Sequence, residues 1–324
     1  MINIRSVVAI LVAVAAIHLH SSAAAAGSWP ERIVRVITPG PPGSSIDVAA
    51  RLFAERLAEL WGKPVVIDNR PGADGIIAVQ AFLQGNDGHS LLFAFPGIVT
   101  VVPLLHDSLP YDPVNDLVPI TSAAYDFLCV AVPEKLPVST LGELVTFAKS
   151  RPDNLNWAAA AGAPYLTFLE FQRRAGLAMT YTSYRNSTQA LPDLMADQIQ
   201  LTIIPLASAL PLARNGRIKL LAVTTPERSA AAPDLMTAIE AGYPELTVEA
   251  PLGFFAPKTM PMELQERIAG DVRSLASDPA IRLRLNGLGM VARGSTPAEY
   301  VAILAEQRAR WAALARTHGM RPQP

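Results

Sequence analysis

The chain has 324 residues, of which 50% are hydrophobic and 17% are charged, and its 27 basic and 28 acidic side chains nearly cancel. That length suits two domains of roughly 150 residues each. A net charge of −1 leaves no excess of Lys and Arg for a phosphate backbone or an anionic membrane surface. Composition therefore argues against a nucleic-acid-binding or membrane-surface protein.

Residues 1–26 have the pattern of a secretory signal peptide. One positive charge, at Arg5, precedes an almost wholly apolar run over residues 6–17, and small residues follow as far as Gly27. We expect cleavage near Ala26 and export to the periplasm. The alternative is an N-terminal membrane anchor, but the run is shorter than the roughly 20 apolar residues that span a bilayer.

From residue 33 onward, strands and helices alternate with short links, which predicts an α/β fold with mostly parallel sheets. Strands are expected over 33–37, 65–67 and 91–95. One helix should begin at Asp47 and end before Gly62, and a second should follow the turn at 69–75 and continue through Leu83. The turn formers of residues 109–116 predict a connection to a second lobe.

The second lobe is expected to begin with the strand around Cys129, the only cysteine, which we interpret as a buried structural thiol. Thr140 and Glu143 have capping-box spacing, so a helix should begin at Leu141. Further strands fit 155–158, 179–184, 199–204 and 218–223, and 252–256 fits a strand that returns to the first lobe. The remainder is predicted to be helical, with helices over 261–276, from 278–279, and from 296–297 to Gly319.

Catalytic and metal-binding patterns are missing from this sequence. There is no G-x-S-x-G elbow, and the three histidines that follow the signal peptide are scattered along the chain. No H-x-x-x-H or C-x-x-C spacing is present, so we expect no metal site. The loop at 40–45 lies between a strand and a helix, but it lacks the lysine of a P-loop and the third glycine of a dinucleotide fingerprint. We therefore expect neither an enzyme nor a cofactor.

The loop before the first helix is the strongest candidate for a binding site. The first-turn amides of a helix have no intrahelical partners, and the helix dipole adds positive charge there, so the junction attracts anions. The alternative, weighted equally, is that Ser45 or Asp47 merely caps the helix. The candidate residues are Gly43, Ser44, Ser45, Ile46 and Asp47.

Two loops of the predicted second lobe are further candidates, because the carboxyl ends of strands form the ligand crevice of open α/β sheets. The first lies between a strand and a helix, where small residues permit close backbone approach, although a plain tight turn is an alternative. It comprises Gly162, Ala163, Pro164 and Tyr165. The second follows the next strand, where a helix should begin at Thr188 or Gln189. It comprises Tyr184, Arg185, Asn186, Ser187 and Thr188.

A family resemblance rests on several motifs in one order along the chain. They are Trp29-Pro30, Pro39–Asp47, Asn69–Gly75, Leu109–Pro113, Ser208–Pro211, Leu221–Thr224 and Gly253–Pro257. With these motifs, the chain resembles the substrate-binding receptors of tripartite tricarboxylate transporters, the Bug or TctC-like family. The resemblance covers essentially the whole chain after the signal peptide.

The resemblance implies a type II periplasmic-binding-protein fold, in which two α/β lobes joined by two crossing strands enclose the ligand cleft. Residues 27–124 and 253–324 would form the first lobe, and residues 125–252 the second. It also implies a monomeric, non-enzymatic receptor whose partners are a small carboxylate and integral-membrane permease subunits. Phe95, Pro96 and Gly97 would form a fourth wall of the site, and Pro205 would end a strand beside it.

Departures from the family pattern bear on the ligand. Many relatives carry a Ser/Gly/Thr-rich loop at 158–163, Thr-Ser-Gly at 95–97 and Asp-Asn at the end of the strand that here reads Ile203-Ile204-Pro205. A highly hydroxylated ligand would therefore leave polar groups unpaired, at roughly 1–3 kcal/mol each. We expect a ligand with one anchored carboxylate and an apolar or aromatic remainder, packed on Tyr165 and Phe95. A sensory receptor of the same fold that signals to a histidine kinase is the alternative function.

Overall fold

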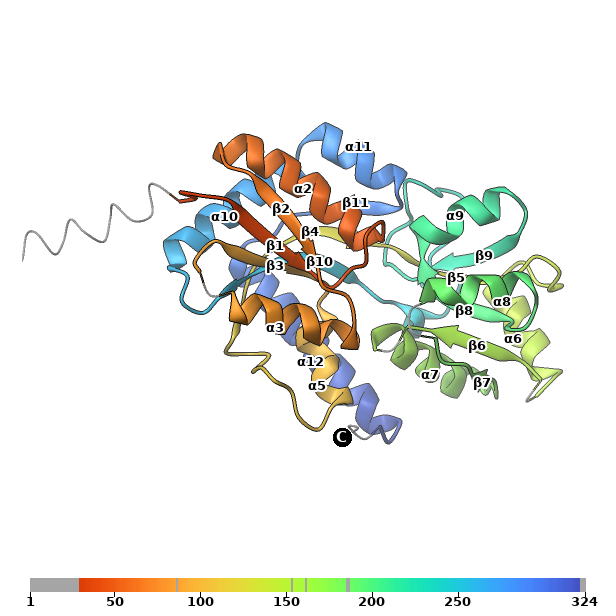
Figure 1. Ribbon diagram of the computed structural model, residues 1–324. Coiled ribbons are helices and arrows are strands. Elements are labelled where there is room, and N and C mark those ends of the chain that lie inside the picture. The colour runs from red at the N-terminus through yellow and green to blue at the C-terminus, as the bar shows by residue number, and fades with distance from the viewer. Residues whose placement is uncertain (1–28, 86, 153, 161, 185–186, 321–324) are drawn as a thin grey trace, which may run out of the picture.

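The computed structural model describes residues 29–85, 87–152, 154–160, 162–184 and 187–320, which form two lobes side by side (Figure 1). Each lobe has its own β-sheet with helices on both faces, so the predicted α/β fold is confirmed. The predicted signal peptide, residues 1–26, lies outside the described residues. Within the described ranges, none of the helices is both long enough and apolar enough to cross a membrane.

The first lobe contains a six-stranded sheet in the order β11-β4-β10-β3-β1-β2. Its strands are β1 (Val34–Thr38), β2 (Val65–Asn69), β3 (Ser90–Ala94), β4 (Leu117–Asp126), β10 (Ala250–Pro257) and β11 (Met290–Ala292). β1 pairs parallel with β2 and β3, while β10 pairs antiparallel with both β3 and β4, and β11 antiparallel with β4. Four strands therefore share one direction, and the two that follow the second lobe run the opposite way.

Helices pack on both faces of this sheet. One face is covered by α2 (Ser45–Trp61), α10 (Met262–Ala276) and α11 (Pro279–Gly287), and the other by α3 (Ile76–Gln84), α4 (Gly97–Thr100) and the first half of α12 (Pro297–Thr317). In α2, Ala49, Phe53 and Leu57 recur at helical spacing and are fully buried. The 3₁₀ turn η1 (Ala73–Gly75) leads into α3.

The second lobe contains a five-stranded sheet in the order β7-β6-β8-β5-β9, in which only β5 runs against its neighbours. The strands are β5 (Leu128–Pro133), β6 (Asn156–Ala159), β7 (Thr180–Tyr181), β8 (Leu201–Pro205) and β9 (Ile218–Val223). The helical segments are α6 (Leu141–Lys149), α7 (Ala163–Ala175), α8 (Leu191–Met195) and α9 (Leu206–Arg214), with 3₁₀ turns η2 (Ser187–Ala190) and η3 (Pro244–Leu246).

The two sheets meet where the chain crosses between lobes. β4 ends at Asp126, β5 begins at Leu128, and Ala250 at the start of β10 lies opposite Asp126. Contacts across the junction come from α5 (Val102–Leu105) and from α12. Tyr300 of α12 lies in the first-lobe core, and Trp311 lies in the second-lobe core. Both crossings fall near residues 124 and 252, which remain our predicted lobe limits.

Most predicted elements are present, but the ten-residue strand β4 was not predicted. Residues 109–116, which were expected to connect the lobes, lead instead into β4 within the first-lobe sheet. Helix α6 begins at Leu141, and the Thr140 hydroxyl accepts a hydrogen bond from the Glu143 amide at 3.1 Å, as capping predicts. Residues 290–292 form strand β11, so the prediction that everything after β10 is helical was wrong. A three-residue strand is too short to show a period-two pattern. The strand predicted over 179–184 shrinks to the two residues of β7.

Candidate functional site

The loop between β1 and α2 is held by a polar network beneath it. Asp47 is 2% exposed and accepts hydrogen bonds from the Gly43 amide at 2.8 Å and from Asn69 Nδ2 at 2.8 Å. Arg51 Nε donates to the same carboxylate at 3.0 Å. Burial acts to raise the pKa of Asp47, but the surrounding donors outweigh it and the pKa is lowered. Asp47 is therefore ionised and committed to shaping the loop.

Two glycines allow the tight course of this loop. A Cβ atom on Gly40 would lie 2.2 Å from Ile46 Cγ2, and Gly43 has a φ of +82°. The Ile46 side chain is buried in the first-lobe core, so only its backbone faces the candidate site. Asn69, from the family motif after β2, fastens the loop by donating to the Gly40 carbonyl at 2.8 Å.

The first turn of α2 keeps free donors. Ser44 occupies the N-cap position but makes no side-chain cap, because its hydroxyl donates to the Pro41 carbonyl at 2.7 Å. In the described part of the chain, the amides of Ser45, Ile46 and Asp47 have no hydrogen-bond partner. With the helix dipole behind them, these amides are a candidate anion-binding surface.

Asp126 joins this surface from the strand that crosses between lobes. The hydroxyl of Ser45, the first residue of α2, donates to Asp126 Oδ2 at 2.6 Å. Asp126 is 6% exposed, and its Oδ1 atom is buried without a hydrogen-bond partner among the described residues. Burial raises the pKa of Asp126 to about 6, and the hydrogen bond from Ser45 acts against that rise. An acid of this kind, at the lobe junction and beside a helix N-terminus, was not among the predicted site residues.

The Phe95-Pro96-Gly97 segment leads into α4, and Val101 after that helix meets Gly162 of the second lobe. Phe95 packs against the first-lobe cores on both faces of the sheet, and the Pro96 carbonyl accepts hydrogen bonds from the first turn of α4. Val101, which follows α4, approaches Gly162 so closely that a Cβ there would lie 3.3 Å from Val101 Cγ1. Gly162 has a φ of +106°, so both its conformation and its contact favour glycine.

Tyr165 belongs to an aromatic cluster at the start of α7. Its ring stacks on Trp157 with centroids 5.5 Å apart and meets Tyr181 edge-on at 4.7 Å. The carbonyls of Ala163 and Pro164 accept from the Thr167 hydroxyl at 3.0 and 2.9 Å, so these two residues are fixed in the first helical turn.

The remaining predicted residues lie at the ends of β7 and β8. Tyr184 donates its hydroxyl to Asp193 Oδ2 at 2.5 Å, so this phenol is committed within the second lobe. Arg185 and Asn186 lie outside the described residues, and Ser187 and Thr188 begin η2 rather than a regular α-helix. Pro205 ends β8 opposite Leu128. The structure thus brings Ser45 together with Asp126, and Val101 together with Gly162.

Known proteins are similar in sequence to this chain over nearly its whole length. Residues 49–320 match the family described as the tripartite tricarboxylate transporter family receptor. A UPF0065 protein of Bordetella bronchiseptica is 33% identical, over 97% of this chain and 93% of the relative. This chain belongs to the tripartite tricarboxylate transporter receptor family.

Solved structures agree with that assignment. The receptor superposes on R. palustris Rpa4515 with adipate with a TM-score of 0.84 and 30% identity, over 91% of this chain and all of the other. MatC (Rpa3494) from Rhodopseudomonas palustris with bound malate gives a TM-score of 0.75 and 27% identity, over 88% of this chain and 99% of the other. The two-lobed periplasmic-binding-protein fold is therefore confirmed, and the family and its structural neighbours are solute-binding proteins.

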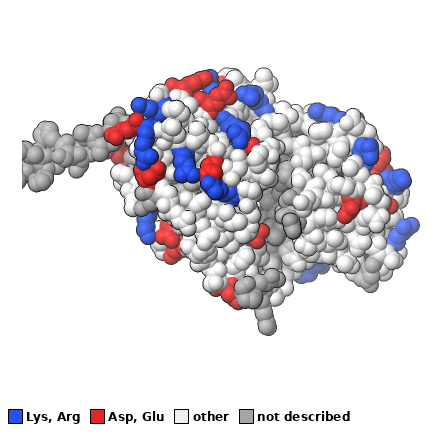
Figure 2. Space-filling view, in the orientation of Figure 1, with Lys and Arg blue, Asp and Glu red and all other residues white. Residues whose placement is uncertain are grey.

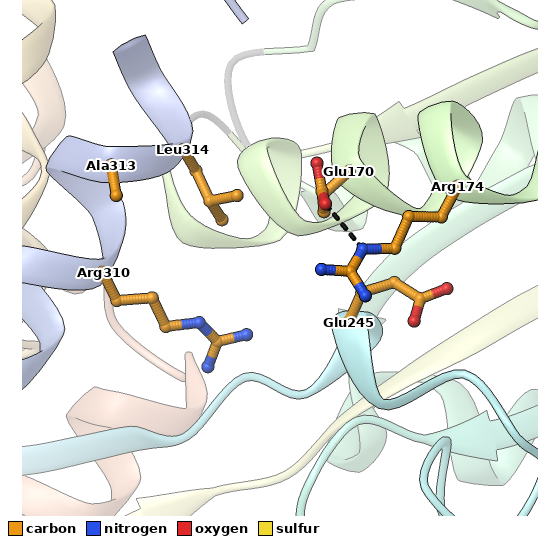
Figure 3. Close-up of a pocket in the computed structure, with 6 residues that line it drawn as sticks. All are labelled: Glu170, Arg174, Glu245, Arg310, Ala313 and Leu314. Atoms are coloured by element: carbon orange, nitrogen blue, oxygen red, sulfur yellow. Dashed lines mark hydrogen bonds and ion pairs between the residues drawn. The ribbon is translucent and has the colours of Figure 1, made fainter. Parts of the chain in front are cut away.

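A hollow of about 200 Å³ lies apart from the strand-end loops, between α7, η3 and α12 (Figure 3). Arg174 points across it and donates to Glu170 at 2.6 Å, while Arg310 donates to the Thr247 carbonyl at 2.7 Å. Glu245 faces Arg174 from η3. Because Arg174 is paired with Glu170 and Arg310 with the Thr247 carbonyl, we interpret the hollow as part of the link between α12 and the second lobe.

The distribution of charged and metal-ligating side chains adds no second candidate site in the described part of the chain. On the face drawn in Figure 2, basic and acidic side chains are mixed rather than gathered by sign. Among the described residues, no group of three or more His, Cys, Asp or Glu side chains is placed to hold a metal ion.

Proposed function

We propose that this receptor captures one small organic carboxylate between its lobes and delivers it to a tripartite tricarboxylate-type membrane transporter. The observation that carries the proposal is the first turn of α2. There the amides of Ser45, Ile46 and Asp47 are unpaired among the described residues, and hydrogen bonds fix the loop that contains them. A carboxylate satisfies such donors and gains from the helix dipole. The neighbours solved with adipate and with malate support a carboxylate as the ligand class.

The second half of the proposed ligand is apolar or aromatic. Tyr165 presents its ring at the start of α7, and its ring partners belong to the second lobe. Phe95 is only partly buried at the end of β3. The strand that ends at Pro205 reads Ile203-Ile204-Pro205, where the family resemblance implies an Asp-Asn pair. With these side chains lining the cleft, a ligand rich in hydroxyls would lose hydrogen bonds to water without regaining them.

The proposed receptor works without chemistry on its ligand. It is exported through the signal peptide, acts as a monomer and binds no cofactor. Its lobes rotate about the two crossing segments to enclose the ligand, as hinged binding proteins do. The proposed ligand contacts are the loops at 43–47, 95–97, 162–165 and 184–188, together with Pro205.

A thermal-shift panel tests the ligand class. Purified receptor is heated with phenylacetate, adipate, malate or citrate, and isothermal titration then gives Kd for each ligand that raises Tm. We expect phenylacetate or adipate to raise Tm most, because binding to the folded state adds stability that grows with ligand concentration. Stabilisation by citrate alone would refute the apolar half of the proposal, and no response to any carboxylate would refute the carboxylate itself.

A matched pair of variants tests the aromatic wall. Tyr165→Leu should weaken phenylacetate binding by about fivefold, the effect of losing roughly 1 kcal/mol of aromatic contact. Leu283→Ala is the control, because Leu283 is 75% exposed on α11 in the first lobe. Equal affinities of the two variants would exclude Tyr165 from the site.

An uptake assay separates transport from the signalling alternative. Cells that lack this receptor should lose uptake of the labelled carboxylate and regain it on complementation. Undiminished uptake, together with loss of a transcriptional response to the carboxylate, would favour the histidine-kinase role.

A further inference from the structure

Asp126 is the one buried acid at the lobe junction, among the described residues, that the binding proposal leaves unused. It ends β4, the strand that leaves the first lobe, and it lies opposite Ala250 of β10, the strand that returns. One carboxyl oxygen accepts from Ser45, and the other is buried without a partner in the described part of the chain. A buried, unsatisfied carboxyl oxygen is costly, which points to a partner that arrives from elsewhere.

We propose that Asp126 takes up one proton from water when the ligand carboxylate binds, and that its Oδ1–H then donates a hydrogen bond to that carboxylate. The inference rests on the proposed function, since it assigns a second anchor to the same anion site. No other bond is made or broken, and the proton returns to water when the ligand leaves.

The position of Ser45 explains why Asp126 and the ligand carboxylate would meet. Ser45 is the first residue of α2, and its own amide is one of the three free donors. Its hydroxyl donates to Asp126 Oδ2 at 2.6 Å, which places the carboxyl group beside those amides. Because Oδ2 already accepts from Ser45, Oδ1 is the oxygen left to carry a proton.

Two ionised carboxylates side by side in a dry site repel each other, and sharing one proton removes that repulsion. Asp126 is prepared for this role before any ligand arrives. Burial raises its pKa to about 6, so a further rise of about two pKa units or more on binding is enough to hold the proton at pH 7.

The neighbouring elements bring no charge that would compete with this effect. On α2 the nearest acid, Asp47, is committed to its own donors, and β11 and β10 place Met290 and Ala250 opposite Asp126. The nearby titratable group on β5 is the thiol of Cys129, whose pKa is raised by burial and by the charge of Asp126.

The charged and titratable groups farther along these elements are turned to other partners. Arg293, after β11, lies over the ring of Tyr125, and Glu249 precedes β10 and accepts from Gln307 through its carbonyl. The helices packed on β4 turn Val272 of α10 and Tyr300 of α12 toward the sheet, and both are fully buried. Among the described residues, burial and Ser45 alone set the pKa of Asp126.

Proton uptake can be measured directly by titration calorimetry. Adipate and phenylacetate serve as probes, and the apparent binding enthalpy is compared at pH 7 in phosphate, imidazole and Tris buffers. The slope against buffer ionisation enthalpy gives protons taken up per ligand. From a free pKa near 6, we expect about 0.9 proton at pH 7 and about 0.5 at pH 6 if the bound form is fully protonated. Kd should then rise about tenfold for each pH unit above 7.

Asp126→Asn is the decisive variant, because its amide can donate to the ligand without titrating. It should bind the probe with no proton uptake and with a Kd that stays flat from pH 6.5 to 8.5. Asp234→Asn, a change at an exposed acid, is the control and should keep the wild-type uptake. Should Asp126→Asn fail to fold, Ser45→Ala serves instead. Removing the Ser45 hydrogen bond raises the pKa of free Asp126, so uptake at pH 7 should fall below the wild-type value.

Each outcome decides between distinct statements. Binding without proton uptake in the wild type overturns the Asp126 inference and leaves the proposed function standing. Equal uptake in wild type and Asp126→Asn also overturns it and assigns the proton to a group other than Asp126. Failure of every carboxylate to bind removes the proposed function, and the inference falls with it.

Discussion

Replacing Asp126 by Asn should change how the stability of the empty receptor depends on pH. Burial raises the pKa of this acid in the folded state from 3.8 to about 6. A group with a raised folded-state pKa stabilises the fold below its unfolded pKa, and that contribution is lost as pH rises through the folded pKa. Wild type should therefore lose stability relative to Asp126→Asn between about pH 4 and pH 6.

The magnitude follows from the size of the shift. A difference of about two pKa units corresponds to roughly 3 kcal/mol between the protonated and ionised forms. At 6% exposure, solvent screens little of this effect. The Asn amide adds a cost that does not vary with pH, about 1–3 kcal/mol if its N–H groups stay unpaired. The test is therefore how the difference in unfolding free energy between Asp126→Asn and wild type changes with pH. The sign of that difference at any one pH does not decide it.

Urea unfolding of both proteins from pH 4 to pH 8 measures that change. The unfolding free energy of Asp126→Asn minus that of wild type should rise by about 2–3 kcal/mol across this range and level off above pH 7. All other titrating groups are common to both proteins, so they cancel. A difference that stays constant within about 0.5 kcal/mol would show that Asp126 is not held in a dry environment, and would refute the reasoning.

Three further predictions concern the scaffold, each measured by urea unfolding. Gly253→Ala should cost about 1–3 kcal/mol or more, because the new Cβ would lie 2.5 Å from the Tyr300 hydroxyl. Full wild-type stability would contradict this packing. Thr296→Ala should cost about 1 kcal/mol by removing the capping box of α12, and Thr296→Ser should recover most of it. Glu170→Gln should lower the unfolding free energy by about 1–2 kcal/mol at pH 7. The loss is no larger because the paired arginines are more than half exposed and solvent screens their charge. Hydrogen bonds from those arginines lower the pKa of Glu170 to about 2, so this difference should shrink as pH falls from 4.5 toward 2.

Much of the fold could be predicted because apolar periodicity and turn residues mark its elements. Buried strands such as β9 and capped helices such as α6 and α12 begin within a residue or so of the expected positions. Strand β4 was missed because Pro119, Thr121 and Ser122 interrupt its apolar run. Those hydroxyls are buried and bond to the segment at 293–295. Long-range partners of that kind leave no local signal.

The loop at 40–47 could be predicted as a candidate site because its turn residues mark it in the sequence. Gly40, Gly43 and the pair Ser44-Ser45 indicate a strand–loop–helix junction. The free amides at a helix N-terminus attract anions, so the junction was a candidate site. The role of Asp47 could not be predicted in full, because Asn69 reaches it from β2, whereas Arg51 lies four residues on in the same helix. The Asp47 carboxylate stabilises the loop, and the Asp47 amide stays among the donors proposed to hold the ligand.

Asp126 is a residue of the candidate site that the sequence alone did not reveal. It stands in the run Ala123-Ala124-Tyr125-Asp126-Phe127, and the sequence shows no partner for it, because Ser45 lies 81 positions away. A single acid inside an apolar strand does carry a signal, since burying a carboxylate without a partner is expensive. The acid must then find a distant donor, hold a proton or meet a ligand. Oδ2 of Asp126 accepts from Ser45. The calorimetric titration tests whether Oδ1 gains a proton when the ligand carboxylate binds.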